Sequence, residues 1–479
     1  MHRSILLACA SSLMLTSCTS DPLSPRPAHA LTRSLDDTLS AEPVPSRFRD
    51  DARSEESTHR ISEIVTADTS PDDIVQLALY RSPELESAYQ QWVAMSERVP
   101  QARALPDPRL NIGFFANEVE TRVGAQQARI GISQQLPWSG KLRASEEAAA
   151  AEARAAWVRY TAIERSITRR VVTALYMLHE LDATIEITRE SLELLSSFED
   201  SIRSRFRVGG GSHPALVRTQ VELGMLEDRL VSLGSARSTL VAQLNALLDR
   251  SHDSTIPVLS ELPVPILDTS LQTLIAQSER TNPTLVALSE RISAQQSRTK
   301  IARYASKPQL TLGVETIFTD DASNPSIAES GDDPLLLTFS VNLPIWRDKY
   351  DAQVQESIAQ RLALAHERQS TRNDLSTRIV QSHFDYTDAQ RRVELYEHTL
   401  IPKATESIRT TLASFRTGSE GFTDLLDAQR TLLEFQLNAL RARTAQGVAL
   451  AQLHELIGIT NASVEQSITR PIQPLENEQ

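Results

Sequence analysis

Apolar residues at every second position mark four short segments of the chain. The segments are residues 109–116, 128–137, 309–318 and 335–344. In the last of them, every second residue from Leu335 to Leu343 is apolar. A period of two is typical of strands with one apolar face, and runs of about ten residues between turns are the signature of transmembrane strands. We expect four strands, although each taken singly is also compatible with a soluble hairpin.

Helical spacing predicts long helices after each pair of strands. Residues 139–207 continue a helical pattern over 69 positions, and residues 347–416 do so over 70. At 1.5 Å per residue, each helix would be about 100 Å long. Shorter helices are expected at residues 83–104, 212–249, 283–306 and 419–457. Two of them open with a capping residue and a proline, at Ser82-Pro83 and Asn282-Pro283.

A leucine stripe predicts how one of these helices packs. Its members alternate at spacings of three and four, interrupted once by Arg237, which is the pattern of a coiled-coil seam. They are Leu223, Leu226, Leu230, Leu233, Leu240, Leu244 and Leu247. Such a stripe indicates packing between helices and implies no chemistry.

The same order of predicted elements occurs in both halves, because the sequence contains an internal repeat. The segment around Pro108 recurs around Pro308 at an offset of 200 residues. A unit of this length is a duplicated domain, since solenoid repeats are much shorter. We therefore predict a mainly α fold with a small β part, built from a duplicated helix-strand-strand-helix repeat. The repeats are expected at residues 71–250 and 271–458, with a linker at 251–270.

The N-terminus has the pattern of an export signal. A basic start, a short apolar run and small residues precede Cys18. The residues before Cys18 resemble a bacterial lipobox, so we expect a signal peptide at residues 1–17 and a lipidated linker at 18–70. An ordinary signal peptide or an anchor helix is the alternative, although the apolar run is too short to span a bilayer. A polar C-terminal tail is expected at residues 459–479.

Composition and charge argue against several functions. A formal net charge of −13 without any run of Lys or Arg argues against nucleic acid as a partner. The sequence has no phosphate-binding loop, and its histidines lack metal-ligand spacing. We therefore predict no enzyme, no cofactor and no metal site; His213 is the one histidine to test for metal, and a solvated loop position is its simpler interpretation. With Cys18 as the one cysteine left after export, no internal disulfide can form.

The strands are the part of the chain that would have to span a membrane. No segment after the signal has the ~18 uninterrupted apolar residues of a transmembrane helix. Four strands cannot close a barrel, because lipid tolerates no unpaired edge and barrels need about eight strands. The chain must then share a barrel with copies of itself. Trp138 and Trp346 follow two of the strands, where they would anchor at a membrane interface or pack under a helix start.

These features together resemble the outer-membrane efflux proteins of the TolC family. The resemblance is carried by the export signal with Cys18, the duplicated plan and the motifs ALPDPRLNIG, QQLPWSGKLR and FRTGSEGFTDLLDAQRTLLEF, and it covers roughly residues 70–458. The first two motifs look most like the heavy-metal efflux lipoproteins of the family. The resemblance implies a channel in the outer membrane of a Gram-negative bacterium, lipid-anchored and barrel-inserted, which extends into the periplasm.

The resemblance also implies an assembly and partners. A homotrimer would close one transmembrane β-barrel of twelve strands, continued by a long α-helical barrel. It would dock to a periplasmic adaptor (membrane fusion) protein and to an inner-membrane pump of the RND type. The three proteins would export substrates, heavy-metal cations among them. The competing hypothesis is a lipid-anchored periplasmic coiled-coil adaptor or structural lipoprotein, which explains the helices and Cys18 but leaves the four matched strands unexplained.

Within the family, the two glycine turns form the periplasmic tip. The resemblance assigns adaptor docking to Val208, Gly209, Gly210, Thr417 and Gly418. Asp424 and Asp427 would form acidic rings that attract cations and gate the pore. Helix capping or solvation is the alternative for both aspartates.

The residues that hold the tip closed in the family are replaced in this chain. Phe415, Glu420 and Ala215 stand at the three positions concerned. Glu420 with Arg218 is the pair that would substitute for this latch, although exposed ion pairs contribute little stability.

Overall fold

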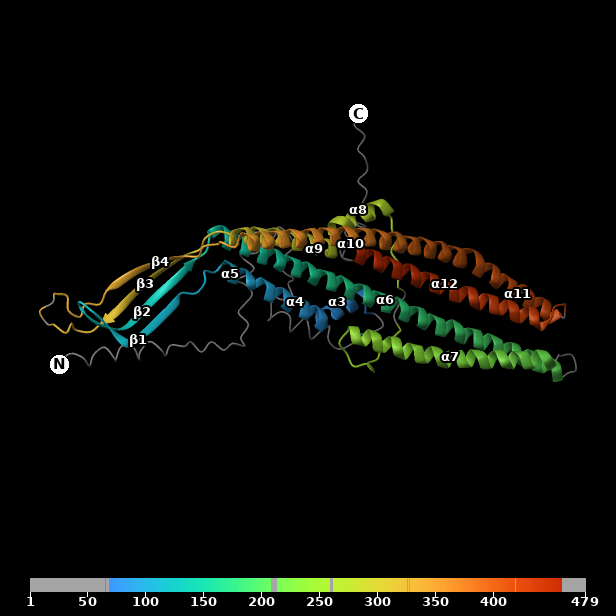
Figure 1. Ribbon diagram of the computed structural model, residues 1–479. Helices are drawn as coiled ribbons and strands as arrows, with labels where there is room; N and C mark the ends of the chain where they lie inside the picture. Colours follow the sequence, from blue (N-terminus) through green and yellow to red (C-terminus); the bar gives the residue numbers. More distant parts are fainter. Residues whose placement is uncertain are drawn as a thin grey trace, which may run out of the picture. The chain divides into compact units, whose positions relative to one another are not determined.

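Each half of the chain folds into short helices, a strand pair and long helices, in the predicted order (Figure 1). The computed structural model describes residue 65 and residues 69–207, 213–258, 262–324, 326, 328–417 and 419–458, all within the unit Ser62–Gln479. The first half contains α3 (Pro71–Arg81), α4 (Pro83–Ser96), α5 (Arg98–Arg103), β1 (Arg109–Thr121), β2 (Gly124–Leu136), α6 (Ser139–Arg207) and α7 (His213–Leu247). The second contains α8 (Leu271–Thr281), α9 (Pro283–Ala305), β3 (Leu310–Thr319), β4 (Leu335–Val341), α10 (Arg347–Leu395), the π-helix η2 (Tyr396–Leu400), α11 (Ile401–Thr417) and α12 (Phe422–Ile457).

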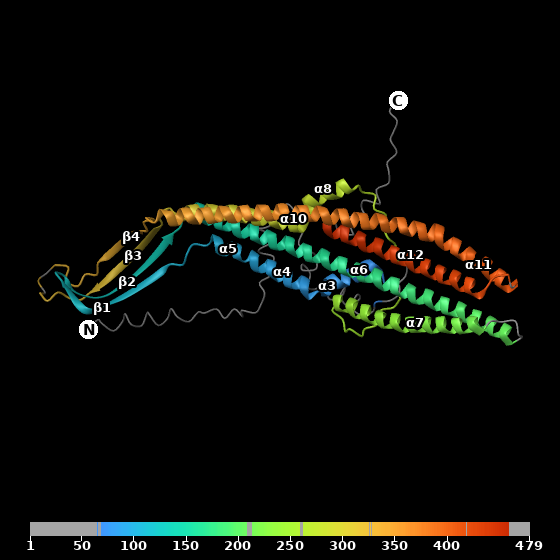
Figure 2. The ribbon, with the colours of Figure 1, turned by 45° about the vertical axis from the view of Figure 1, so that its right-hand side comes forward.

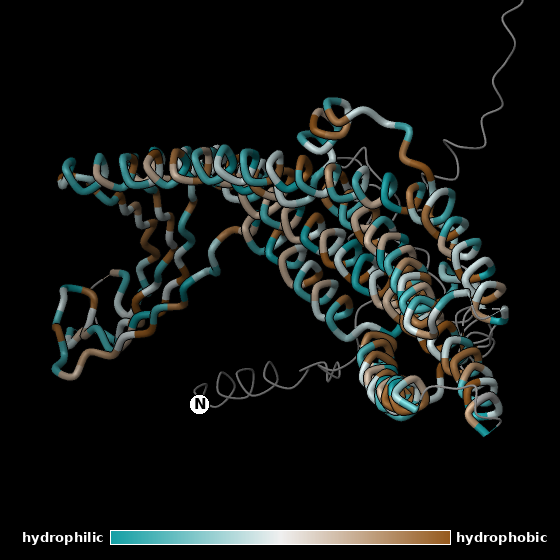
Figure 3. Tube along the Cα trace, turned by 90° about the vertical axis from the view of Figure 1, so that its right-hand side faces the viewer, coloured by the Kyte–Doolittle hydropathy of each residue, from teal (hydrophilic) through white to brown (hydrophobic). Residues whose placement is uncertain are grey.

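The four strands form one antiparallel sheet in the order β1-β2-β3-β4, so the two repeats pair through β2 and β3. The register aligns Leu110, Ile132, Val314 and Leu337 in one row across the sheet. Because successive side chains of a strand point to opposite faces, this register gathers the alternating apolar residues on a single face, where all four are exposed. Hydrophobic and hydrophilic positions accordingly alternate along the strands (Figure 3). The predicted strands with one apolar face are confirmed.

The opposite face of the sheet carries charged and polar side chains together with Ile317 and Leu336, and glycines make room for the charged ones. Gly113 pairs with Arg129, and Gly131 pairs with Glu315. A Cβ added at Gly131 would lie 3.0 Å from Cβ of Glu315, and one at Gly113 would lie 2.8 Å from Nε of Arg129. Arg129 and Glu315 approach each other to 3.7 Å across this face. The two faces therefore suit two different environments, one apolar and one aqueous.

The long helix α6 connects the two halves of the fold. It contacts α4 and α7 of its own half and α9 and α12 of the other, and it lies between α7 and α12 in both views (Figures 1 and 2). Its 69 residues match the predicted range in full. Among the helices of the described ranges, none contains a stretch apolar enough to cross a bilayer.

The predicted helix starts at Ser82 and Asn282 are confirmed. The Ser82 hydroxyl accepts a hydrogen bond from the Leu85 amide at 3.2 Å, and the Asn282 side chain accepts one from Thr284 at 3.0 Å. Each cap satisfies an amide that the first helical turn leaves without a partner. Sequence analysis had not identified α3 and α8, the short helices that precede these caps, although Ser70 and Ser270 cap them in the same way.

Two predicted helices are interrupted, each at a proline. Residues 347–416 were expected as one helix, but α10 gives way to η2 and α11. Pro402 lacks an amide hydrogen and its ring clashes with the carbonyl four residues earlier, inside η2, so a wider turn relieves the clash. Residues 83–104 likewise divide into α4 and α5, and α4 ends four residues before Pro100. The remaining helix ends match the prediction or differ from it by one to three residues.

Buried leucines join the long helices near the end farthest from the sheet. One cluster combines Leu195 and Phe198 of α6, Leu226 of α7, and Leu425 and Leu433 of α12. In the leucine stripe of α7, Leu226 and Leu244 are buried and the other members are half-buried. The stripe therefore serves packing, as predicted.

A glycine in α12 allows close contact with α6. A Cβ added at Gly447 would lie 2.5 Å from the ring of Tyr176. The Tyr176 hydroxyl donates a hydrogen bond to the Pro263 carbonyl at 3.1 Å, and burial raises the pKa of Tyr176 to about 12. The ring is thus held from both sides and has little freedom to move away.

We expect Gly447→Ala to destabilise the protein, although alanine is the better helix former by about 1 kcal/mol. The added methyl overlaps a fixed ring, and overpacking of this kind costs about 1–3 kcal/mol. Gly224→Ala in α7 is the matched control, because no atom lies within 4 Å of the added Cβ; this change should be neutral or stabilising. Thermal unfolding of the detergent-solubilised variants measures both effects. Equal stability of the two variants would contradict close packing at Gly447.

Candidate functional site

The two helical hairpins, α6 with α7 and α11 with α12, turn at the same end of the unit, opposite the sheet (Figures 1 and 2). Of the residues predicted at this tip, Val208, Gly209, Gly210 and Gly418 lie outside the described residues. Thr417 is the last residue of α11, where its hydroxyl donates to the Ser414 carbonyl at 2.9 Å. His213 opens α7 and lies 5.6 Å, between ring centres, from Phe206 at the end of α6.

Asp424 caps the start of α12. One of its carboxylate oxygens, Oδ2, accepts a hydrogen bond from the Gly421 amide at 3.1 Å. A carboxylate in the first turn is also favoured by the positive end of the helix dipole. The capping expected as the alternative for this residue is therefore present, and it leaves the side chain exposed at the tip.

Asp427 lies one turn further along the same exposed face of α12. Its side chain is 64% exposed, and one oxygen lies 3.8 Å from a guanidinium nitrogen of Arg430. The buried side of this helix carries Leu425 and Leu426 instead. Asp424 and Asp427 thus form a pair of exposed acidic groups at neighbouring turns.

The side chain of Arg218, one member of the expected latch pair with Glu420, contacts a different residue. Arg218 reaches α12 through the hydroxyl of Thr423, to which it donates at 3.4 Å. Within the described part of the tip, Glu420 forms no ion pair with Arg218. The two hairpins are instead joined one turn further from the tip.

Glu222 of α7 and Arg430 of α12 form that junction. Arg430 donates from Nε to Oε1 of Glu222 at 3.1 Å and from Nη2 to Oε2. This bidentate geometry is typical of an arginine that binds a carboxylate. These hydrogen bonds raise the pKa of Arg430. Only 11% of the Glu222 side chain is exposed, so its charge depends on this partner. Beside it, the buried Gln429 donates to the Ser191 hydroxyl of α6.

Sequence analysis missed this junction. Gly209 and Gly418 of the two tip turns are 209 positions apart, and this offset aligns Arg430 with Val221, directly before Glu222. That alignment was the available signal, since it places an acid of α7 and a base of α12 at neighbouring positions of the two equivalent helices. It was insufficient because the offset says nothing about which faces of the helices meet.

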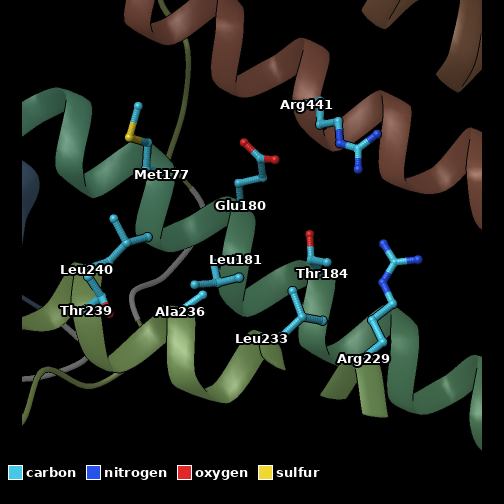
Figure 4. Close-up of a pocket in the computed structure, with 10 residues that line it drawn as sticks. All are labelled: Met177, Glu180, Leu181, Thr184, Arg229, Leu233, Ala236, Thr239, Leu240 and Arg441. Carbon is cyan, nitrogen blue, oxygen red and sulfur yellow. The ribbon is translucent and has the colours of Figure 1, made fainter. Parts of the chain in front are cut away.

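A groove lies between α6 and α7 further along the hairpin (Figure 4). Its volume is about 590 Å³, and its floor includes Leu181, Leu233 and Leu240. Glu180 and Arg441 project from the facing helices α6 and α12 above it (Figure 4). In the part of the chain that the structure describes, no group of three His, Cys, Asp or Glu side chains is placed to hold a metal ion. The groove is an open surface between packed helices and does not assemble acid-base or nucleophilic chemistry.

A comparison with protein families decides the family. The profile described as "Outer membrane efflux protein" matches residues 74–250 and 274–459, in two copies that follow the repeats. The chain belongs to this family. It is an outer-membrane efflux channel with a periplasmic extension, and it is not an enzyme. The resemblance to the TolC family is thereby confirmed.

Two individual proteins are distant relatives of this chain. The cobalt-zinc-cadmium resistance protein CzcC of Cupriavidus metallidurans is 22% identical over 349 residues, covering 71% of this chain and 78% of that protein. The outer membrane protein TolC of Vibrio cholerae is 24% identical over 401 residues, covering 81% of this chain and 90% of that protein.

Solved structures of this kind share the fold. The outer membrane protein VceC of Vibrio cholerae superposes with a TM-score of 0.67 at 18% identity, covering 81% of this chain and 96% of that one. The structure of CusC gives 0.70 at 14% identity, covering 83% and 94%. The mainly helical fold with one four-stranded sheet is therefore shared with VceC and CusC.

Proposed function

We propose that three copies of this chain form one channel, which conducts substrates from a periplasmic adaptor and an inner-membrane pump of the RND type to the cell exterior. The observation that carries the proposal is the open sheet. One of its faces is mainly apolar, with Gln134 and Thr316 as polar members, and β1 and β4 are edge strands of the sheet. An edge in lipid would leave backbone groups without hydrogen-bond partners, at a cost of several kcal/mol each.

Copies of the chain can remove both edges. Because all neighbouring strands are antiparallel, β4 of one copy and β1 of the next would also run antiparallel and continue the same pattern. Two copies would give eight strands, which enclose a space that side chains fill. Three copies would give twelve strands and an open lumen, lined by the polar face with Arg129 and Glu315.

The tip supports docking and gating roles. Asp424 and Asp427 would place six carboxylates around the axis of a trimer, which favours cations and holds the tip against anions. The turns with Val208, Gly209, Gly210, Thr417 and Gly418 would present the docking surface to the adaptor. The junction of Glu222 with Arg430 would hold the two hairpins of each copy together near the tip.

The cargo and the anchor complete the proposal. The name of the Cupriavidus relative refers to cobalt, zinc and cadmium, and heavy-metal cations are the cargo class that we propose for this chain.

Cys18, which lies outside the described residues, would carry the lipid anchor after removal of residues 1–17. The exposed apolar face of the sheet disfavours the alternative of a lipid-anchored adaptor or structural lipoprotein, because such a protein would leave that face in water.

A mass measurement tests the assembly. The Cys18→Ser variant, which lacks the anchor, should still require detergent for extraction from the membrane and should have three times the mass of one chain in mild detergent. The lipidated wild type should give the same mass after correction for lipid. Release of the variant as a soluble monomer would refute the channel and favour an anchored adaptor.

A further inference from the structure

The end of the sheet that joins the helices is basic, within a chain that is acidic as a whole. Residues 98–109, 137–147, 299–309 and 343–351 contain ten Lys and Arg and five Asp and Glu, whereas the whole chain has a formal net charge of −13. The opposite end of the sheet carries a net negative charge. Residues 116–127 and 319–334, which comprise the strand ends and turns at this side of the sheet, contain one basic residue and seven acidic ones. The sheet therefore has a positive and a negative end.

Six of these basic residues, three from each repeat, form a group that we name the basic belt. Its members follow or precede the strands at the junction with the helices: Arg103, Lys141, Arg143, Lys307, Arg347 and Lys349. All are exposed or half-exposed. Across the described ranges, Lys141, Arg347 and Lys349 make no ion pair, and Arg103 makes one only at 3.8 Å, to Glu146. Most of this charge is thus free to meet an external anion.

Exposed tryptophans and aliphatic residues lie within the belt. Trp346, directly before Arg347, is 71% exposed, and its neighbours Leu343 and Ile345 are exposed as well. Trp138 follows Leu136 of β2 and donates its indole N–H to the Pro308 carbonyl at 2.7 Å. These residues continue the apolar face of the sheet up to the level of the basic side chains.

One contact fixes a belt cation next to this aromatic edge. Lys307 of the second repeat lies with its Nζ 5.6 Å from the ring centre of Trp138 of the first and 4.5 Å from that of Tyr304. The cation is held over aromatic faces, and no carboxylate neutralises it among the described residues. Its charge and the indole ring therefore share one position at the boundary between apolar and polar surface.

We propose that the basic belt binds the phosphate groups of anionic phospholipids in the periplasm-facing leaflet of the membrane. Amphipathic rings favour the headgroup level of a bilayer, and Lys and Arg at that depth bury their apolar stems while their charged ends reach the phosphates. The apolar face of the sheet fixes the depth at which the belt meets the leaflet. The inference rests on insertion of the sheet in the membrane and adds a lipid class to it.

Lipid titration tests the proposal. Phosphatidylglycerol or phosphatidylcholine is added to the detergent-solubilised full-length protein, and bound lipid is measured by native mass spectrometry. The wild type should bind phosphatidylglycerol more tightly, with an advantage that falls as salt is added. The variant Arg347→Gln with Lys349→Gln should bind it roughly tenfold more weakly, while binding of phosphatidylcholine should stay unchanged.

A matched variant removes the same charge elsewhere. Lys403→Gln with Arg409→Gln changes two exposed residues of α11, distant from the sheet, and should bind both lipids as the wild type does. Equal weakening in the two variants, or a wild type without preference for phosphatidylglycerol, would overturn the proposal. Assembly mass and membrane insertion are recorded on the same samples. A wild type that neither assembles nor inserts would refute the proposed channel, whereas normal insertion without lipid preference would refute the belt alone.

Discussion

Arginine in place of Phe339 is expected to abolish stable insertion of the protein in the outer membrane. Phe339 lies near the middle of β4 on the apolar face, and its side chain is 74% exposed. An arginine near the midplane of a bilayer costs about 2–4 kcal/mol on the lipid-facing side of a barrel. In the proposed trimer, this cost would arise three times. The amount of folded protein in the outer-membrane fraction measures the effect.

The adjacent residue provides the control. Ser340 is also exposed, but it points to the opposite, polar face of the same strand. Ser340→Arg should insert at close to the wild-type amount, because its charge would face the water-filled side. If Ser340→Arg failed to insert in the outer membrane and Phe339→Arg inserted normally, the face with Ser340 would be the one in contact with lipid. The proposed lining of the lumen would then be wrong.

Loss of the two tip carboxylates is expected to abolish cation selectivity of the channel. In the variant Asp424→Asn with Asp427→Asn, six negative charges would be absent from a trimer, at a constriction where little water screens them. Reversal potentials in planar bilayers should shift toward zero, the value of a channel that does not discriminate between cations and anions. Conductance should rise, and block by polyvalent cations from the periplasmic side should disappear.

Asparagine separates the charge of Asp424 from its role as a cap. Its side-chain oxygen can still accept the hydrogen bond that the Gly421 amide donates at 3.1 Å, whereas alanine would remove both charge and cap, at about 0.5–2 kcal/mol for a typical capping residue. Arg218→Ala is the control, since this arm should affect closure more than selectivity. If alanine changed the channel and asparagine did not, the aspartates would act as caps and the gate would have to lie elsewhere.

The sequence predicts those parts of the fold that depend on local periodicity. The strands follow from the alternation between Leu335 and Leu343, and α6 follows from an uninterrupted helical pattern that the structure reproduces from Ser139 to Arg207. The break at η2 was predictable in principle, because Pro402 is visible in the sequence and acts on the carbonyl four residues earlier. A proline also occurs near the start of many unbroken helices, so its presence alone did not distinguish the two outcomes.

Tertiary contacts were less accessible from the sequence. The acidic pair of Asp424 and Asp427 could be placed on one helix face by its spacing, and capping by Asp424 was one of the two alternatives considered. The junction of Glu222 with Arg430 joins residues 208 positions apart. Their pairing depends on how α7 and α12 rotate about their own axes, which neither spacing nor repeat offset determines.

The π-helix makes the two repeats inequivalent in a way that affects symmetry. In the sheet, strand pairs of the two repeats alternate, and a closed trimer would approximate six similar units around its axis. Along the helices this approximation ends, because α6 is continuous whereas its counterpart contains η2. Around the axis, continuous and interrupted long helices would alternate, and the true symmetry would be threefold. A partner that contacts all six hairpins would therefore meet two different surfaces in turn, so identical adaptor subunits would have to bind in two distinct ways.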